Sequence, residues 1–318
     1  MSEDEKTPPH SAKSQAIDRL TQVSSHLTPS TKMIKANSPK NALRADYSDV
    51  LGQINSLRPI AAKPDTANRG YKRQKQAGKL WVRERIERLL DADSFHEIGS
   101  VSGSVTWQTV KPTQEKPVAF VPSNNVQGGG RLGGRSILLT ADDFSIRSGY
   151  ADGASGAKTV YVEKLAVALR LPVVKPVDGS SGGGSVTTIR TEGWSYLPYL
   201  QSFPHVMQQL NMGIPNLAAV VGPAIGLGAA RAVVCNFSVM AANVGALFNA
   251  GPQVVASATF EEDLTLQDLG GPMVHCTNGT IDNLAADEPE CYNQIRSVLS
   301  YLPNSGSEAP PILTCNDP

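Results

Sequence analysis

The sequence predicts an α/β protein in which the strands of one sheet alternate with helices around a single core. Three observations support this prediction. Short Val-rich runs are separated by helical stretches of about ten to fifteen residues, which is the pattern of a layered α/β core. Two of these runs end in glycine-rich turns that lead into a helix start. The 318 residues allow a sizeable core, and 28 glycines with 22 prolines indicate a loop-rich chain rather than a helical bundle.

The composition argues against several classes of protein. The formal net charge is +0, so neither nucleic acid nor an anionic membrane is expected as the main partner. No run of roughly eighteen apolar residues occurs, so no transmembrane helix is expected. The four cysteines, Cys235, Cys276, Cys291 and Cys315, form no C-x-x-C pair, which argues against a zinc ribbon or a redox dithiol. We expect Cys235 to be a small buried hydrophobic residue.

Residues 1–70 are expected to form a partly disordered N-terminal arm, and residues 71–318 the folded domain. The arm is rich in Ser, Thr, Pro, Asn and Lys, a composition that favours disorder. It contains one amphipathic piece that predicts a docking helix. The apolar residues at helical spacing in this piece are Ile17, Leu20, Val23 and Leu27. The acidic start, MSEDEKTPPH, is not typical of a signal peptide or a mitochondrial presequence, so it does not fix the compartment.

A helix followed by a strand is expected at the start of the domain, in GKLWVRERIERLLDADSF. The apolar residues on one face of this helix are Trp81, Ile86, Leu89 and Leu90. The acidic stretch at residues 91–93 ends the helix, and a strand follows around residues 96–98.

The segment NNVQGGGRLGGRSILLTADDF predicts a β-hairpin with its turn at residues 132–135. The glycines at 128–130 resemble a nucleotide loop, but they lead into a strand and not a helix, so we reject a nucleotide site there. Gly156 and Lys158 are not adjacent, and we likewise reject an ATP-binding P-loop.

The remaining chain alternates strand and helix. Strands are expected at 172–177, 217–221 and 237–241. Helices are expected from Gly153, over about 198–211, from Gly226, and after Gly251 and Ala285.

The two glycine-rich turns are the most informative feature of the sequence. LPVVKPVDGSSGGGSV contains the first, at residues 182–184, and NLAAVVGPAIGLGAARAVVC contains the second, with Gly222, Gly226 and Gly228. Glycine lets a ligand approach the backbone, and the N–H groups at a helix N-terminus form a positive pole. Two such turns could hold an oxyanion during reaction at an acyl group. The alternative is that both are only tight, closely packed turns.

No arrangement of catalytic side chains accompanies these turns. Ser181 lacks the G-x-S-x-G elbow of serine hydrolases. The histidines of the domain are His96, His205 and His275. None has a second histidine four residues away, so no metal site is expected. Asp142 and Asp143 are expected to form a turn or a cap at a strand end. Backbone chemistry therefore remains as the candidate.

The order of motifs resembles the carboxyltransferase (beta) subunits of biotin-dependent acyl-CoA carboxylases of the propionyl-/methylcrotonyl-CoA type. GKLWVRERIERLLDADSFHEIG is similar to the family's opening segment, and the glycine-punctuated hairpin follows it. Residues 178–184 match the family's D-S-G-G-A turn, and residues 222–229 match its G-P-x-x-G-G-A turn. GALFNAGPQVV, LGGPMVHCTNGTIDNLAADEPE and YLP follow in the family's order. The likeness covers about residues 70 to 310.

This resemblance implies a crotonase-type (ClpP/crotonase-like) fold, a spiral of ββα units preceded by the irregular arm. In the family, carboxybiotin on another protein releases its carboxyl group beside the bound acyl-CoA. The freed biotin nitrogen takes a proton from the acyl-CoA. The α- or γ-carbon of the resulting thioester enolate then attacks the released CO2. The implied cofactor is therefore biotin supplied by a partner. ATP is used only by the partner biotin carboxylase, and no metal is bound by this chain.

The resemblance also implies the site residues. Those of the backbone oxyanion hole are Gly226, Leu227 and Gly228. Those of the acyl-CoA pocket are Ser181, Gly182, Gly183 and Gly184. Leu227 replaces the family's second glycine of this turn, but a backbone amide of leucine can still donate. Residues 185–188 (SVTT) replace a charged stretch of the family, a change that bears on acyl preference.

Family members contain two homologous halves, and this sequence corresponds to the N-terminal one. It contains no A-M-K-M biotin-attachment motif. The sequence is therefore either a fragment or a chain that needs a separate partner. In both cases we expect an acyl-CoA-binding half in a homo- or hetero-oligomer, inactive without the missing C-terminal half and served by a biotin carboxylase/biotin carrier subunit. The resemblance suggests the mitochondrial matrix, with the cytoplasm as the alternative.

Two other interpretations stay open. One is a free-standing crotonase-type hydratase, isomerase or thioesterase, which would need a carboxylate near the second turn. Residues 222–235 contain none. The other is a catalytically silent binding or assembly module that retains the fold and the subunit interface.

Overall fold

The computed structural model describes residues 47–111, 114–153, 156–179, 182–194, 200, 202–312 and 314–315. The chain divides into two compact units, Met1–Ser48 and Asp49–Pro318, and the strands of the described residues all lie in the second unit. The docking helix expected within residues 17–27 and the predicted pocket residue Ser181 lie outside the described residues. Among the described residues, no helix is long and apolar enough to cross a membrane.

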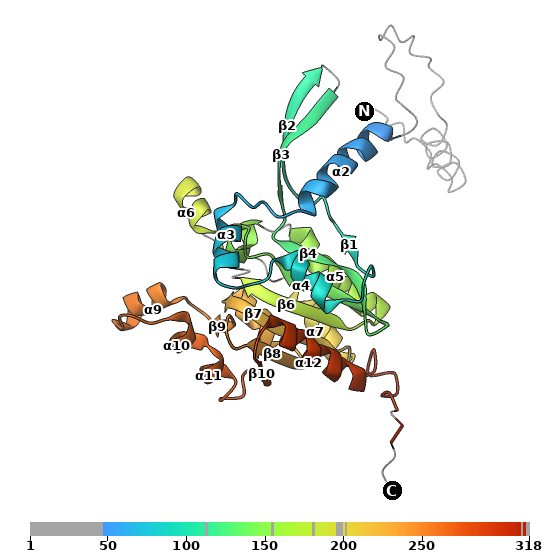
Figure 1. Cartoon of the computed structure of the whole chain (residues 1–318), viewed down its shortest axis with the longest axis vertical. Coiled ribbons are helices and arrows are strands. Elements are labelled where there is room, and N and C mark those ends of the chain that lie inside the picture. The colour runs from blue at the N-terminus through green and yellow to red at the C-terminus, as the bar shows by residue number, and fades with distance from the viewer. Residues whose placement is uncertain are drawn as a thin grey trace, which may run out of the picture. The chain divides into compact units, whose positions relative to one another are not determined.

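An eight-stranded mixed sheet forms the centre of the second unit (Figure 1). Its strands are β1 (His96–Ile98), β4 (Asn125–Leu132), β5 (Arg135–Asp142), β6 (Val173–Gly179), β7 (Asn216–Ile225), β8 (Phe237–Ala241), β9 (Ala246–Phe248) and β10 (Asn283–Ala285). The order is β1-β4-β5-β6-β7-β8-β10, and β9 pairs with β7. The pairs among β1, β4 and β5 are antiparallel, and those from β5 onward are parallel. The predicted hairpin is confirmed, because Leu132 pairs with Arg135.

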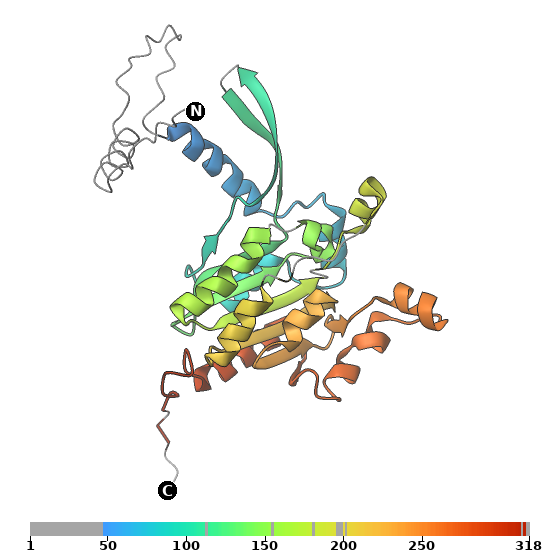
Figure 2. The ribbon, with the colours of Figure 1, turned by 180° about the vertical axis from the view of Figure 1, so that it is seen from behind.

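Helices cover both faces of this sheet (Figure 1 and Figure 2). On one face lie α4 (Val82–Leu89) and α12 (Glu288–Tyr301). On the other lie α5 (Gly156–Leu169), α7 (Phe203–Asn211) and α8 (Leu227–Val233). A strand covered on both faces is apolar along its length and not only at alternate positions, which explains the continuous Val-rich runs in the sequence.

Strand β7 shows this two-sided burial clearly. Leu217, Ala219 and Val221 belong to the core beneath α4 and α12. Ala218 and Val220 alternate with them and pack in the core beneath α8. The α/β class predicted from the sequence is therefore confirmed, and the predicted strand at residues 237–241 coincides with β8.

Several elements near the start of the domain were not predicted. Helix α2 (Ser48–Ala61) lies within the stretch expected to be an irregular arm, so the expected disorder does not extend to it. Its Leu57 and Ala61 pack against Phe120, and this apolar contact stabilises the helix. Phe120 belongs to a separate two-stranded ribbon, β2 (Gly103–Lys111) with β3 (Gln114–Pro122). A further helix, α3 (Arg69–Gln76), precedes α4.

The chain between β9 and β10 forms three short helices, which lie beside the sheet in Figure 1. They are α9 (Pro252–Thr259), α10 (Leu266–Gly270) and α11 (Pro272–His275). The predicted helix after Gly251 is confirmed by α9, but none of its residues is buried. The helix expected from Gly153 begins at Gly156, because a 3-10 turn, Ala151–Gly153, precedes it.

Candidate functional site

The two glycine turns lie at the same edge of the sheet, because β6 and β7 are parallel neighbours. Val177 pairs with Val220, and Gly179 pairs with Ala224. Adjacent strands are about 4.8 Å apart, so turns that leave both strands at their carboxyl ends lie side by side. The first turn leads into α6 (Val186–Glu192) and the second into α8, as the sequence predicts.

The second turn is shaped by Gly226, the N-cap of α8. Its φ of 55° and ψ of −111° define a backbone conformation that only glycine adopts readily. The Gly226 amide donates to the Phe248 carbonyl oxygen at 2.9 Å, so this amide already has an acceptor. Leu227 and Gly228 are the first residues of α8, where the helix itself provides no acceptor for an N–H group. Of the three predicted residues, these two are therefore the better candidate donors.

The first turn is attached to the domain through Asp152. The carboxylate accepts hydrogen bonds from the Ser185 amide at 3.0 Å, the Ser185 hydroxyl at 2.7 Å and the Thr188 hydroxyl. Arg147 forms an ion pair with it at 3.0 Å. Burial alone would raise the pKa of Asp152, but the hydrogen bonds from Thr188 and Ser185 hold it below its usual value. Ser185 in turn caps α6, so Asp152 fixes the start of that helix.

A buried network of four charged side chains lies next to both strands. Lys79 Nζ is 2.7 Å from Asp178 Oδ1, and Arg85 Nη1 is 2.8 Å from Asp178 Oδ2. Arg85 Nε donates to Glu288 Oε2 at 2.7 Å, and its Nη2 donates to the Val221 carbonyl oxygen at 2.9 Å. Burial lowers the pKa of Lys79. Burial would also lower the pKa of Arg85, but Asp178 and Glu288 outweigh it and raise that pKa.

Sequence reasoning missed this network, although one signal was present. Arg85 lies on the same helical face as Val82, Ile86 and Leu89, and all four are buried. A charged residue in the apolar stripe of a helix indicates a buried partner, here Asp178 at the end of β6.

The carboxylates at the end of β5 differ in role. Asp143 accepts from the Ser145 amide at 2.9 Å and the Trp81 indole at 3.0 Å, so the predicted turn is confirmed for this residue. Asp142 instead pairs with Arg231 of α8 at 2.9 Å, which was not predicted. Asp142 Oδ2 also accepts the Asp178 backbone N–H at 3.4 Å. It therefore connects α8 to the strand that carries the first turn.

The remaining candidate side chains do not gather into a site. His275 contacts the Leu247 carbonyl oxygen at 2.6 Å, and among the described residues no group of three metal-ligating side chains occurs. Cys235 is half-buried against the core and not fully buried as expected, because it lies at the end of α8; the buried thiol is Cys291.

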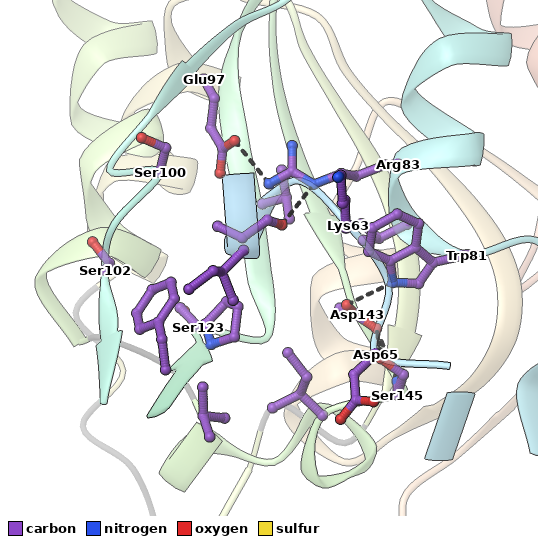
Figure 3. Close-up of a pocket in the computed structure, with 18 of the residues that line it drawn as sticks. Lys63, Asp65, Trp81, Arg83, Glu97, Ser100, Ser102, Ser123, Asp143 and Ser145 are labelled. Atoms are coloured by element: carbon purple, nitrogen blue, oxygen red, sulfur yellow. Dashed lines mark hydrogen bonds and ion pairs between the residues drawn. The ribbon is translucent and has the colours of Figure 1, made fainter. Parts of the chain in front are cut away.

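A pocket of about 120 Å³ opens next to the end of β5 (Figure 3). Its charged residues are Lys63, Asp65, Arg83, Glu97, Asp143 and Lys158. Glu97 accepts from Arg83 at 2.9 Å, as Figure 3 shows, and lies 3.7 Å from the ammonium of Lys158. Burial lowers the pKa of Lys158. Those residues of the two glycine turns that the structure describes do not line the pocket, but β5 is the neighbour of β6, so the pocket and the first turn share one edge of the sheet.

Comparison with known proteins identifies the family. Residues 73–318 match the model of the carboxyl transferase domain. The methylmalonyl-CoA decarboxylase subunit alpha of Veillonella parvula is 31% identical over 247 residues, which cover 77% of this chain and 46% of that protein. The mitochondrial propionyl-CoA carboxylase beta chain of Homo sapiens is 29% identical over 287 residues, covering 87% of this chain and 51% of that protein.

A solved structure shows the same fold. The transcarboxylase 12S with hydrolyzed methylmalonyl-coenzyme A bound superposes with a TM-score of 0.66 at 25% identity, covering 84% of this chain and 51% of that one. The crotonase-like fold implied by the resemblance is therefore confirmed. The chain spans about half the length of the curated relatives it matches.

The Asp152 contacts predict a pH-dependent stability. Because the folded-state pKa of Asp152 lies below its unfolded value of about 3.9, its contribution is present above about pH 4 and is lost as the pH falls below that. Asp152→Asn should therefore cost about 1 kcal/mol in free energy of unfolding at pH 7, and the difference from the unsubstituted protein should shrink towards pH 3. Urea unfolding at both pH values measures this.

The matched control is Asp263→Asn, the same change at an exposed carboxylate. It should leave the free energy of unfolding unchanged at both pH values. A difference for Asp152→Asn that is as large at pH 3 as at pH 7 would contradict the assignment.

Proposed function

Because the chain belongs to the carboxyl transferase domain family, we propose that it is the acyl-CoA-binding half of a biotin-dependent acyl-CoA carboxyltransferase. One observation carries the proposal. Two glycine turns leave neighbouring parallel strands at one edge of the sheet, and each leads into a helix start. This arrangement brings backbone N–H groups of two elements to one place, which is what a developing oxyanion requires.

The backbone amides would act on the thioester carbonyl of the acyl-CoA. Leu227 and Gly228 would donate from the second turn, and residues 182–184 would line the acyl-CoA pocket at the first. Loss of the proton next to the carbonyl places negative charge on its oxygen, so these donors stabilise the enolate more than the thioester. Residues 222–235 contain no carboxylate that could serve as the base. Carboxybiotin on a partner would supply both the carboxyl group and the ureido nitrogen that takes the proton.

The pocket beside β5 suits the polyanionic part of coenzyme A. It lies at the same sheet edge as the first turn, and Lys63, Arg83 and Lys158 line it. Cationic side chains form the strong, charge-assisted hydrogen bonds that phosphate groups require. Arg83 and Lys158 share Glu97 as their partner, whereas Lys63 is an exposed side chain at the pocket. Lys63 is therefore the cation that can turn most readily to a phosphate.

The chain spans about half of its relatives, and a second half would complete the site. Large apolar side chains lie exposed near α9 to α11, and they fit a surface that another subunit covers. They are Val254, Phe260 and Met273. The partner set would include a biotin carboxylase/biotin carrier subunit, which alone uses ATP. The mitochondrial relatives support a location in the mitochondrial matrix, and the bacterial relatives support the cytoplasm as the alternative.

Gly226→Asp tests the second turn. A carboxylate at this position would repel the negative charge that builds up on the carbonyl oxygen. We expect at least tenfold weaker binding of an acyl-CoA analogue in which a nitronate group stands for the enolate, measured by calorimetry. The control is Gly279→Asp, which also has a positive φ and open space around its Cβ position. Equal affinity of Gly226→Asp and the unsubstituted protein would rule out a site at this turn.

Lys63→Ala tests the pocket. Removing a cation that binds phosphate should weaken coenzyme A binding about fivefold at low ionic strength and less at high salt, because screening reduces the contribution. Lys164→Ala, at an exposed position of α5, is the control. A coenzyme A affinity that is the same in both variants would place the phosphates elsewhere.

Complementation tests the half-site. The chain alone should show no carboxyl transfer, because the α-carbon and the carboxyl donor must be held about 3–3.5 Å apart by two sites. Mixing it with the C-terminal half of a family member, carboxybiotin and acyl-CoA should give a malonyl-type product. Turnover by the chain alone would show a complete site and contradict the proposal of a half.

A further inference from the structure

We propose that Arg85 is a positioning residue that fixes the two glycine turns relative to each other, an inference that rests on the proposed function. Its side chain is completely buried and comes from α4, which packs on the face of the sheet beneath the turns. It acts through Asp178, at the start of the first turn motif, and through the two strands from which the turns emerge.

One guanidinium group connects these two strands where their regular pairing ends. Arg85 Nη1 lies 2.8 Å from the carboxylate of Asp178, which precedes the last residue of β6, Gly179. Arg85 Nη2 donates at 2.9 Å to the carbonyl oxygen of Val221, which follows the last regularly paired residue of β7, Val220. A planar group that binds both strands sets the distance between them and their relative position along the strand direction.

Backbone pairing alone leaves this region less defined. The ladder between β6 and β7 is regular up to Val177 and Val220. Beyond them the register shifts, and the next pair is Gly179 with Ala224. An oxyanion site needs its donors held within about 0.5 Å, which an irregular ladder does not guarantee. A side-chain bridge at this level supplies the missing constraint.

The rest of the network fixes the orientation of the guanidinium. Glu288, at the first turn of α12, accepts from Arg85 Nε at 2.7 Å and from the Leu80 amide at 2.9 Å. Tyr292 donates its hydroxyl to the same carboxylate at 3.3 Å. Glu288 is therefore held on two other sides and keeps the plane of the Arg85 side chain in one position.

The second cation of the network is accommodated by a glycine. Lys79 pairs with Asp178 at 2.7 Å beside Gly222. A Cβ atom at Gly222 would lie 2.0 Å from Asp178 Oδ1, so any side chain there would displace the ion pair. With Lys79 and Arg85 opposite Asp178 and Glu288, the network is neutral, which is the condition under which buried charges are tolerated.

Arg85→Lys tests the proposal, because lysine keeps the charge but cannot bind Asp178, Glu288 and the Val221 carbonyl together. The readout is the preference of the protein for the nitronate analogue over a thioether analogue that lacks the carbonyl. This ratio isolates the backbone donors from the rest of coenzyme A binding. We expect the ratio to fall at least tenfold, while the affinity for the thioether analogue changes less than twofold.

The matched control is Arg135→Lys. Arg135 also makes several hydrogen bonds through its guanidinium, to Asn304 and to the carbonyls of Leu299 and Leu302, but it lies at the hairpin turn. Arg135→Lys should change the melting temperature without changing the ratio of the two affinities. A merely structural role for Arg85 would give the same behaviour as this control.

The outcomes separate the two proposals. If the unsubstituted protein shows no preference for the nitronate analogue, the proposed function fails and the role of Arg85 fails with it. If the preference is present and a folded Arg85→Lys variant retains it, only the role of Arg85 is overturned. Should Arg85→Lys not fold, Glu288→Gln decides, because it keeps the Asp178 pair and loosens the guanidinium. A ratio unchanged in Glu288→Gln would then overturn the inference.

Discussion

Asp178 carries a negative charge in the interior of the domain. Residues of α4 and of the neighbouring strands β5 and β7 are arranged around that charge. A completely buried carboxylate is costly unless cations and hydrogen-bond donors surround it. Lys79 and Arg85 approach its oxygens from one side, and Asp142 of β5 accepts its backbone N–H. Gly222 leaves room for the ion pair. Displacing Lys79 or Arg85 would leave the buried charge unpaired, and these contacts therefore hold α4, β6 and the segment before α4 together.

The sequence predicts those parts of the fold whose signals are local. Strands β6, β7 and β8 appear as continuous apolar runs because both faces of each are covered. The hairpin appears because Gly133 and Gly134 separate two β-like runs. The two turns appear because glycine is needed where the chain leaves a strand at φ and ψ values such as those of Gly226.

The parts that were missed depend on contacts between distant segments. Helix α2 is stable because Leu57 packs on Phe120 of the ribbon, a partner that periodicity within residues 48–61 cannot reveal. The carboxylate partners of Arg85 lie about ninety and about two hundred residues away in the sequence, and charged residues on helices usually face solvent. Only its place in an apolar stripe marks it as buried. The Gly226 amide looked available from the motif alone, but its acceptor, Phe248 of β9, comes from the next strand pairing.

The neutral network of buried charges and the backbone donors together explain how the candidate site could tolerate changes in its side chains. The positive charges of Lys79 and Arg85 are balanced by Asp178 and Glu288, so the buried network contributes rigidity and little net field at the turns. In the proposed function, the stabilisation of an enolate is then left to oriented amides, whose geometry depends on the strands and not on the residue type. Leu227 can therefore stand where the motif that this turn resembles has glycine, provided that α8 starts at the same place. The start of α8 is set by the pairing of β6 with β7 and by the Arg85 side chain that connects these two strands.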